Sequence, residues 1–232
     1  MDEVPKHIAI IPDGNRRWAK QNGKPALEGH RVGIDNLRKV SEWCRDFGVK
    51  TVTYWGFSIE NFQRDKAEVQ GLLRLFEFKF DEFKDHPELR ENQIRVRFFG
   101  RLSMLTPKLR EKIKEVEKET EGYSNYSMNI LLAYGGKSEI VDACNAAIAD
   151  AKAGEISAVD EESFGKYFYM HGLPEPDLVI RTSGEMRMSG ILPWGSMYSE
   201  YYFSPKLWPE FSREDLAAAV AEFASRKRRF GK

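Results

Sequence analysis

The chain has 232 residues, which is enough to bury the core of one large α/β domain or of two small ones. Lysine plus arginine and aspartate plus glutamate both count 36, so the formal net charge is zero. This balance argues against a general nucleic-acid binder, which carries a basic excess. No apolar run approaches the roughly 18 residues of a membrane span, and the first residues lack the basic and apolar regions of a signal peptide. We therefore expect a cytoplasmic protein.

Segments of strand character alternate with segments of helical periodicity along the chain. The strand-like apolar runs are residues 7–11, 52–57, 94–99, 128–134 and 177–180. The helical patterns are residues 32–47, 67–84, 108–121, 138–152 and 213–229. Such alternation is typical of βαβ units, and no convincing linker interrupts it. The sequence thus predicts one α/β domain with a central, mainly parallel sheet flanked by helices.

Three of these segments carry more specific expectations. Residues 94–99 alternate arginine with apolar side chains, a pattern that indicates a strand near the edge of the sheet. The pattern at residues 67–84 is apolar beyond its main stripe, at Leu75 and Phe78, so this helix has apolar groups on more than one side. The helix at residues 138–152 is expected to turn four side chains inward, namely Ile140, Val141, Cys144 and Ile148.

The two cysteines, Cys44 and Cys144, are far apart in the sequence and lack the spacing of metal ligands. We expect both to be small buried side chains in a reducing compartment. The four histidines show no metal-binding spacing either, and His86 and His171 are interpreted as surface or packing residues.

Polar side chains follow four of the predicted strands where each strand ends. These segments are residues 13–17, 58–64, 134–137 and 181–189. In a parallel sheet such ends share one edge, which is where open α/β folds bind ligands. Arginines, acids and hydroxyls that converge there without a basic excess favour a ligand with several phosphates over a nucleic acid. ATP or NAD lacks support because the sequence contains no P-loop and no strand followed by Gly-x-Gly-x-x-Gly.

The first of these loops begins at Asp13, whose carboxylate can hold a divalent metal ion. Gly14 lets the backbone come close to a ligand, and the free N–H groups of a helix that begins here favour an anion. Arg16 and Arg17 add fixed positive charge suited to phosphate. The loop predicts a metal and phosphate site, and the alternative is a tight turn with solvated arginines.

Two further assignments leave an alternative open. Arg181 and Arg187 face either the ligand or surface acids. His30, which follows Gly29 near the first loop, is placed at the site, and a packing role is the alternative.

At this point several ordered blocks together resemble a known family, the cis-prenyltransferases, or undecaprenyl diphosphate synthase family. The blocks are DGNRRWAK, GH at 29–30, FSIENFQR, YGGK, RTSGEMRMS, SEYYF and the terminal RRFG at 228–231. The resemblance implies one domain over residues 1–232, a mainly parallel sheet flanked by helices with an apolar tunnel between them, and a homodimer. It also implies Mg²⁺-dependent condensation of isopentenyl diphosphate with an allylic prenyl diphosphate to a Z-polyprenyl diphosphate, with peripheral membrane contact possible when the product is released.

The resemblance also assigns roles to residues. Asp13 and Glu200 would be the metal carboxylates, and Asn61 with Ser58 would serve proton removal after the carbon–carbon bond forms. The groups at the allylic substrate would be Gly14, Asn15, Arg16, Arg17, Trp18, His30 and Phe62, with Ile59, Glu60 and Arg64 on a supporting loop. The groups at the incoming isoprenoid would be Arg181, Arg187, Met188 and Ser189. The tail at 229–231 would reach into the partner's site.

Departures from the family pattern bear on the product. Ala26 stands where an arginine that contacts the allylic diphosphate is common, and Lys24 is a candidate substitute. Three residues that normally shape the acceptor loop are replaced, by Gly190, Pro193 and Gly195. The glycines add conformational freedom to this loop. Leu131 and Leu132 stand where long-chain enzymes often keep small residues, which predicts a product shorter than the bacterial cell-wall carrier.

Three other functions remain as alternatives. A loosened acceptor loop would allow irregular, non-head-to-tail coupling or transfer to another acceptor. A non-catalytic partner subunit is disfavoured because such subunits typically lose the aspartate and paired arginines that are intact here. A phosphate-binding module without chemistry would not need Ser58, Asn61 and Glu200 at matching places.

Overall fold

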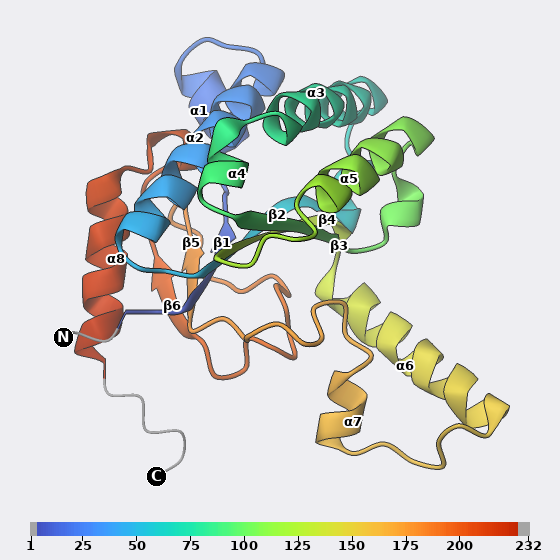
Figure 1. Ribbon diagram of the computed structural model, residues 1–232. Coiled ribbons are helices and arrows are strands. Elements are labelled where there is room, and N and C mark those ends of the chain that lie inside the picture. Colours follow the sequence, from blue (N-terminus) through green and yellow to red (C-terminus); the bar gives the residue numbers. More distant parts are fainter. Residues whose placement is uncertain (1–3, 227–232) are drawn as a thin grey trace.

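Six parallel strands form one sheet at the centre of the molecule, as a computed structural model of the chain shows for residues 4–226 (Figure 1). Their order is β3-β4-β2-β1-β5-β6. The strands are β1 (His7–Ile11), β2 (Thr51–Ser58), β3 (Ile94–Phe99), β4 (Tyr126–Tyr134), β5 (Leu178–Arg181) and β6 (Glu200–Phe203). The prediction of a parallel α/β fold is therefore confirmed.

Helices connect the strands, together with three short 3-10 turns. The helices are α1 (Asn15–Gln21), α2 (Ala26–Asp46), α3 (Lys66–Lys84), α4 (Pro87–Glu91), α5 (Pro107–Glu119), α6 (Gly136–Ala153), α7 (Glu161–Gly165) and α8 (Arg213–Ser225). The 3-10 turns are η1 (Ile59–Gln63), η2 (Leu102–Met104) and η3 (Trp208–Glu210). In Figure 1, α2 to α5 and α8 gather on one side of the sheet, whereas α6 and α7 project away from it on the other. Within residues 4–226 no helix is long and apolar enough to cross a membrane.

Both faces of the sheet are buried, and alternate residues of each strand serve different cores. On β1, Ile8 and Ile10 join the large core beneath α2, α3, α5 and α8, whereas Ala9 and Ile11 join a smaller core on the opposite face. The strand β3 lies at an edge, as its alternating arginines predicted. Ile94, Val96 and Phe98 of β3 are buried, whereas Arg95 and Arg97 are only partly buried.

The structure corrects the orientation predicted for α6. Its buried face consists of Gly136, Glu139, Ala143 and Ala147. Ile140, Val141 and Ile148 are exposed, because the adjacent stripe meets the rest of the protein instead, through its glycine and alanines and through Glu139, which accepts hydrogen bonds from the Tyr134 hydroxyl and the Tyr169 amide. Cys144 lies on this exposed side, so the expectation that both cysteines are buried was wrong for Cys144 and is confirmed for Cys44.

Other differences concern element boundaries. The sequence reading missed β6, a four-residue strand that lies at the sheet edge. It also began α2 six residues too late, because the helix starts at Ala26, directly after Pro25. α8 ends at Ser225, and the predicted tail at 229–231 lies outside the described residues.

Candidate functional site

A polar pocket of about 750 Å³ lies where β1, β2 and β5 end. These strands are neighbours in the sheet, so the loops that follow them meet although they are distant in sequence. Eleven of the predicted site residues line the pocket, namely Asp13, Gly14, Asn15, Arg16, Arg17, His30, Ser58, Asn61, Arg64, Arg181 and Ser189. Lysines 20 and 24 line it as well, beside Ala26.

The carboxylate of Asp13 is held between backbone and guanidinium donors. Its Oδ1 accepts a hydrogen bond from the N–H of Gly14 (2.8 Å), and its Oδ2 accepts one from Nη2 of Arg181 (3.1 Å). The carbonyl of Asp13 accepts hydrogen bonds from the Thr182 hydroxyl (2.7 Å) and the Trp208 amide (3.0 Å). The backbone of this residue is thus fixed, while its side chain, 36% exposed, remains open to the pocket.

Arg181 links the two halves of the pocket. Its side chain is only 5% exposed, and besides Asp13 it donates to the Ser189 hydroxyl (2.7 Å) and to the carbonyl of Arg187. Because the planar guanidinium offers several donors in fixed directions, one side chain holds both the first loop and the loop after β5.

The remaining arginines are paired with acids near the pocket rim. Arg17 and Arg187 both contact Glu185, and Arg17 also donates to the Ser183 hydroxyl. Arg16 and Arg64 both contact Glu68, at 3.5 and 3.4 Å. The arginines are therefore gathered at the pocket, but the backbone of Arg187 takes part there rather than its exposed guanidinium.

His30 lies at the inner end of the polar pocket. Burial, reinforced by the positive charges of Arg64 and Arg16, lowers the pKa of His30 to about 4. Its Nε2 is buried and has no hydrogen-bond partner within the described residues. The imidazole is therefore neutral at physiological pH.

Ser58 and Asn61 form a local motif that the sequence reading did not anticipate. The Ser58 hydroxyl accepts from the amide of Asn61 (3.3 Å), and Oδ1 of Asn61 accepts from the amide of Ser58 (3.1 Å). This reciprocal capping box starts the 3-10 turn η1. The spacing Ser-x-x-Asn after a strand was the available signal. Both side chains still line the pocket, so capping and a role toward a ligand are compatible.

Some predicted residues lie outside the pocket lining. These are Trp18, Ile59, Glu60, Phe62, Arg187, Met188 and Glu200. Phe62 packs edge-on against Phe57, with ring centroids 4.9 Å apart, and contacts the large core.

Glu200 is not brought to Asp13 in this chain. It pairs with Leu178 at the start of β6, which places it level with Ile8 and at the opposite end of the sheet from Asp13. There it accepts a hydrogen bond from Arg226 (2.6 Å). The two carboxylates are therefore not brought together within residues 4–226. No group of three or more His, Cys, Asp or Glu side chains that could hold a metal gathers in the described residues either.

The acceptor loop is anchored rather than loose. Gly190 has a φ of +86°, and a Cβ placed on the facing Gly136 would lie 2.1 Å from the Gly190 carbonyl. The amide of Leu192 donates to the Tyr134 hydroxyl at 2.9 Å. The absence of a side chain at Gly136 permits this close contact, and the left-handed backbone at Gly190 suits glycine. These contacts hold the loop against the start of α6.

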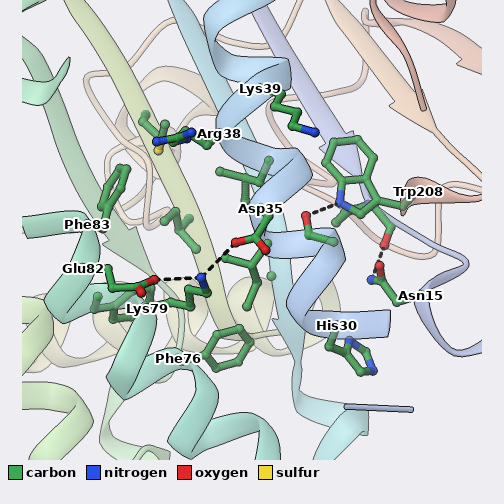
Figure 2. Close-up of a pocket in the computed structure, with 18 of the residues that line it drawn as sticks. Asn15, His30, Asp35, Arg38, Lys39, Phe76, Lys79, Glu82, Phe83 and Trp208 are labelled. Atoms are coloured by element: carbon green, nitrogen blue, oxygen red, sulfur yellow. Dashed lines mark hydrogen bonds and ion pairs between the residues drawn. The ribbon is translucent and has the colours of Figure 1, made fainter. Parts of the chain in front are cut away.

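An apolar cavity of about 560 Å³ continues from the polar pocket between α2 and α3. Figure 2 shows His30 and Phe76 on opposite walls of this cavity. Its sheet-side floor is formed by β2 and β4, through Gly56, Met128, Ile130 and Leu132. Both spaces share five lining residues, namely Pro12, Asn15, His30, Gly56 and Phe76. Leu131 packs on the opposite face of the sheet, so of the two predicted leucines only Leu132 narrows the cavity.

Close packing of α2 against α1 fixes the junction between pocket and cavity. A Cβ at Gly29 would lie 2.2 Å from the carbonyl oxygen of Asn15, and one at Gly33 would lie 2.2 Å from Oδ1 of Asn15. The two glycines thus let Asn15 lie against α2. The Gly-x-x-x-Gly spacing of Gly29 and Gly33 indicates such a close helix contact, but our sequence analysis did not use it.

Comparison with known proteins agrees with this geometry. The family described as "Putative undecaprenyl diphosphate synthase" matches residues 11–231. The chain is 45% identical, over 99% of its length and 88% of the relative's, to the geranylgeranyl-diphosphate-specific tritrans,polycis-undecaprenyl-diphosphate synthase of Thermococcus kodakarensis. It is 41% identical to the isoprenyl transferase of Thermus thermophilus, over 99% of the chain and 89% of the relative. The solved structure of lavandulyl diphosphate synthase from Lavandula x intermedia, in complex with dimethylallyl diphosphate, superposes with a TM-score of 0.94 at 34% identity and covers 99% of both chains.

The chain therefore belongs to the undecaprenyl diphosphate synthase family, the cis-prenyltransferases. It is a transferase of prenyl groups in isoprenoid biosynthesis.

Proposed function

We propose that this enzyme condenses isopentenyl diphosphate with an allylic prenyl diphosphate to give a Z-polyprenyl diphosphate of short to medium length. The observation that carries the proposal is the continuity of the polar pocket and the apolar cavity. A substrate with an anionic diphosphate head and an apolar tail fits such a pair of joined spaces. Because the Thermococcus relative is named as specific for geranylgeranyl diphosphate, we take that compound as the expected primer.

The residues at the pocket suit two diphosphates. The allylic diphosphate would lie at the start of α1, where Gly14 lets the backbone come close and Arg16 and Arg17 add positive charge. The second diphosphate would lie beside Arg181 and Ser189. Fixed guanidinium groups stabilise the charge that develops as the allylic diphosphate departs, without reorganisation of the site.

The polar pocket fits a magnesium ion of the kind that binds substrate phosphates. Mg²⁺ is usually held by one or two carboxylates plus phosphate oxygens and waters, and Asp13 offers a partly exposed carboxylate among cationic side chains. When bound, the ion would supply neutralisation of the departing diphosphate. Asn61 and Ser58 would assist removal of the proton after the carbon–carbon bond forms, and Lys24 would replace the arginine absent at Ala26.

Product analysis tests the proposal. Purified protein with Mg²⁺ and isopentenyl diphosphate would be supplied with dimethylallyl, geranyl, farnesyl or geranylgeranyl diphosphate, and the dephosphorylated products read by mass spectrometry and NMR. We expect a ladder of Z-linked polyprenols. Folded protein that forms no product with any primer would contradict the proposal and favour a non-catalytic subunit.

Irregular coupling is the second candidate, because the lavandulyl diphosphate synthase structure superposes over almost the whole chain. A further incubation, from which isopentenyl diphosphate is omitted, separates the two reactions. Dimethylallyl diphosphate supplied alone would give a branched ten-carbon product under irregular coupling and none under head-to-tail condensation. The anchored acceptor loop favours the regular reaction.

We also propose that the enzyme is a homodimer in which a second copy covers the outer face of α6. Val141 and Ile148 on this face are 52% and 51% exposed, and Ile140 lies beside them. Apolar groups clustered on one helix face indicate a contact surface. We expect light scattering to give twice the chain mass, and Val141→Glu combined with Ile148→Glu to halve it. A monomeric wild-type protein would exclude this interface.

A further inference from the structure

The apolar cavity has a charged border on its helix side. Its inner wall consists of apolar residues of α2 and α3, namely Ile34, Leu37, Phe76, Phe80 and Phe83. Interleaved with them in sequence are charged residues, which we call the α2–α3 seam and define as Asp35, Arg38, Lys79, Glu82 and His86. A border of this kind is unexpected beside a space that suits an apolar chain.

Lys79 is the centre of this seam. Its Nζ lies 2.9 Å from Oδ1 of Asp35 on α2 and 2.7 Å from Oε2 of Glu82 on α3 (Figure 2). A second contact joins Arg38 of α2 to Nε2 of His86, the N-cap residue of α4 just past the end of α3, at 2.5 Å. Lys79 and Asp35 therefore join α2 directly to α3, and Arg38 joins α2 to the segment that follows α3.

Lys79 is unusually enclosed for a lysine. Its side chain is 15% exposed, against 33% for Lys84, five residues further along the same helix. Burial disfavours its charged form, but the hydrogen bonds to Glu82 and Asp35 prevail and raise the pKa of Lys79. Loss of these partners would destabilise the folded protein, because a buried ammonium group without an opposite charge raises its free energy. Parting α2 from α3 would therefore be opposed by this ion pair.

We propose that Lys79, through its ion pair with Asp35, closes the seam and limits the length of the prenyl chain that the enzyme makes. The inference rests on the proposed function. The sheet closes the cavity floor through Ile130 and Leu132, and the polar pocket occupies its other end. A chain that outgrows the cavity leaves between α2 and α3, where it must separate Lys79 from Asp35 and place apolar carbon against both charges.

The test compares product lengths of three variants with the wild type under the same primer. Lys79→Met keeps the length of the side chain and removes its charge. Asp35→Asn removes the partner charge from the other helix, so the test does not depend on one variant folding. Lys84→Met is the matched control, because Lys84 lies on α3 like Lys79, pairs with Glu115 of α5 (3.1 Å) and does not line the cavity.

We expect Lys79→Met and Asp35→Asn to shift the main product by at least one isoprene unit toward longer chains, and Lys84→Met to keep the wild-type distribution. Unchanged distributions in both seam variants, with active wild-type enzyme, would overturn this inference and leave the proposed function intact. An equal shift in Lys84→Met would also overturn it, since general loosening of α3 would then be the cause. Absence of product from the wild type would instead refute the proposed function, and the inference with it.

Discussion

The polar pocket and the apolar cavity share five lining residues yet are built in different ways. The pocket is assembled from loops distant in sequence, and a few directed contacts hold it, such as Arg181 with Asp13 across 168 positions. The cavity is lined by two helix faces and the sheet beneath them, whose side chains recur at regular spacing. The pocket therefore depends on individual polar groups, whereas the cavity depends on the volume and spacing of its walls.

This difference predicts different outcomes for substitutions in the two regions. Changes in the polar pocket should lower the rate with little effect on which product forms. Changes in the cavity should alter the product or the stability while the chemistry continues. The following tests address this separation.

The largest effect is expected from loss of the Asp13 carboxylate. Asp13→Asn preserves size and the acceptor for the Gly14 amide but removes the charge available to a metal. We expect turnover to fall by about 10²- to 10³-fold, since preorganised charge at the leaving group contributes on that order. Steady-state kinetics would measure it, with the unfolding temperature as a check of folding. Turnover within a few-fold of the wild type would exclude a metal role for Asp13.

A smaller loss is expected for Arg181→Lys. Lysine cannot reproduce the fork that joins Asp13 to the acceptor loop, so we expect about a 10- to 100-fold loss in kcat/KM, largely through the KM for isopentenyl diphosphate. Arg101→Lys is the matched control, because Arg101 binds Asp142 in a bidentate manner at 2.9 Å outside the polar pocket. Equal losses in both variants would mean that Arg181 acts only through folding.

Substitution of two adjacent leucines distinguishes the effect of cavity volume on product length from the effect of protein stability. Leu132→Ala and Leu131→Ala both remove a fully buried side chain, and each should lower the free energy of unfolding by about 2–5 kcal/mol in urea titrations. Only Leu132 lines the cavity, so Leu132→Ala alone should lengthen the product. Longer products from Leu131→Ala would show that stability rather than cavity shape controls length.

The smallest effect concerns the junction of the two regions. Because the pKa of His30 is lowered to about 4, the unfolded chain takes up a proton below pH 6.5 that the native state does not, so stability falls as the pH drops from 6.5 toward 4. His30 should therefore lower the free energy of unfolding by about 2 kcal/mol between pH 7 and pH 5. His7 is fully buried, and its burial likewise lowers its pKa to about 4. It should therefore add a similar loss in the free energy of unfolding over the same pH range.

Urea unfolding at the two pH values measures this effect. In His30→Gln the loss between pH 7 and pH 5 should be smaller by about 2 kcal/mol, because glutamine does not titrate. The same pH dependence in variant and wild type would mean that His30 is protonated in the native protein.

Much of the fold could be predicted because its signals are local. The alternation of apolar runs placed five strands, and the arginines of β3 marked it as an edge strand. The strand β6 was missed because residues 200–203 are few and only partly buried, so no periodicity separates them from a loop. The prediction of the buried face of α6 was wrong because two adjacent stripes of this helix carry apolar residues. The stripe that contacts the rest of the protein is the one with the glycine and the alanines.

The sequence by itself determined that Asp13, the arginines and the hydroxyl residues lie at one edge of a parallel sheet, because strand ends in such a sheet share a direction. Only the tertiary structure decided which of them meet. It joined Arg181 to Asp13 and placed Glu200 at the far end of the sheet beside Arg226. It also paired Lys79 of α3 with Asp35 of α2 at the border of the cavity. Contacts of this kind depend on strand register and helix spacing, which arise from the packing of the whole chain and have no local pattern in the sequence.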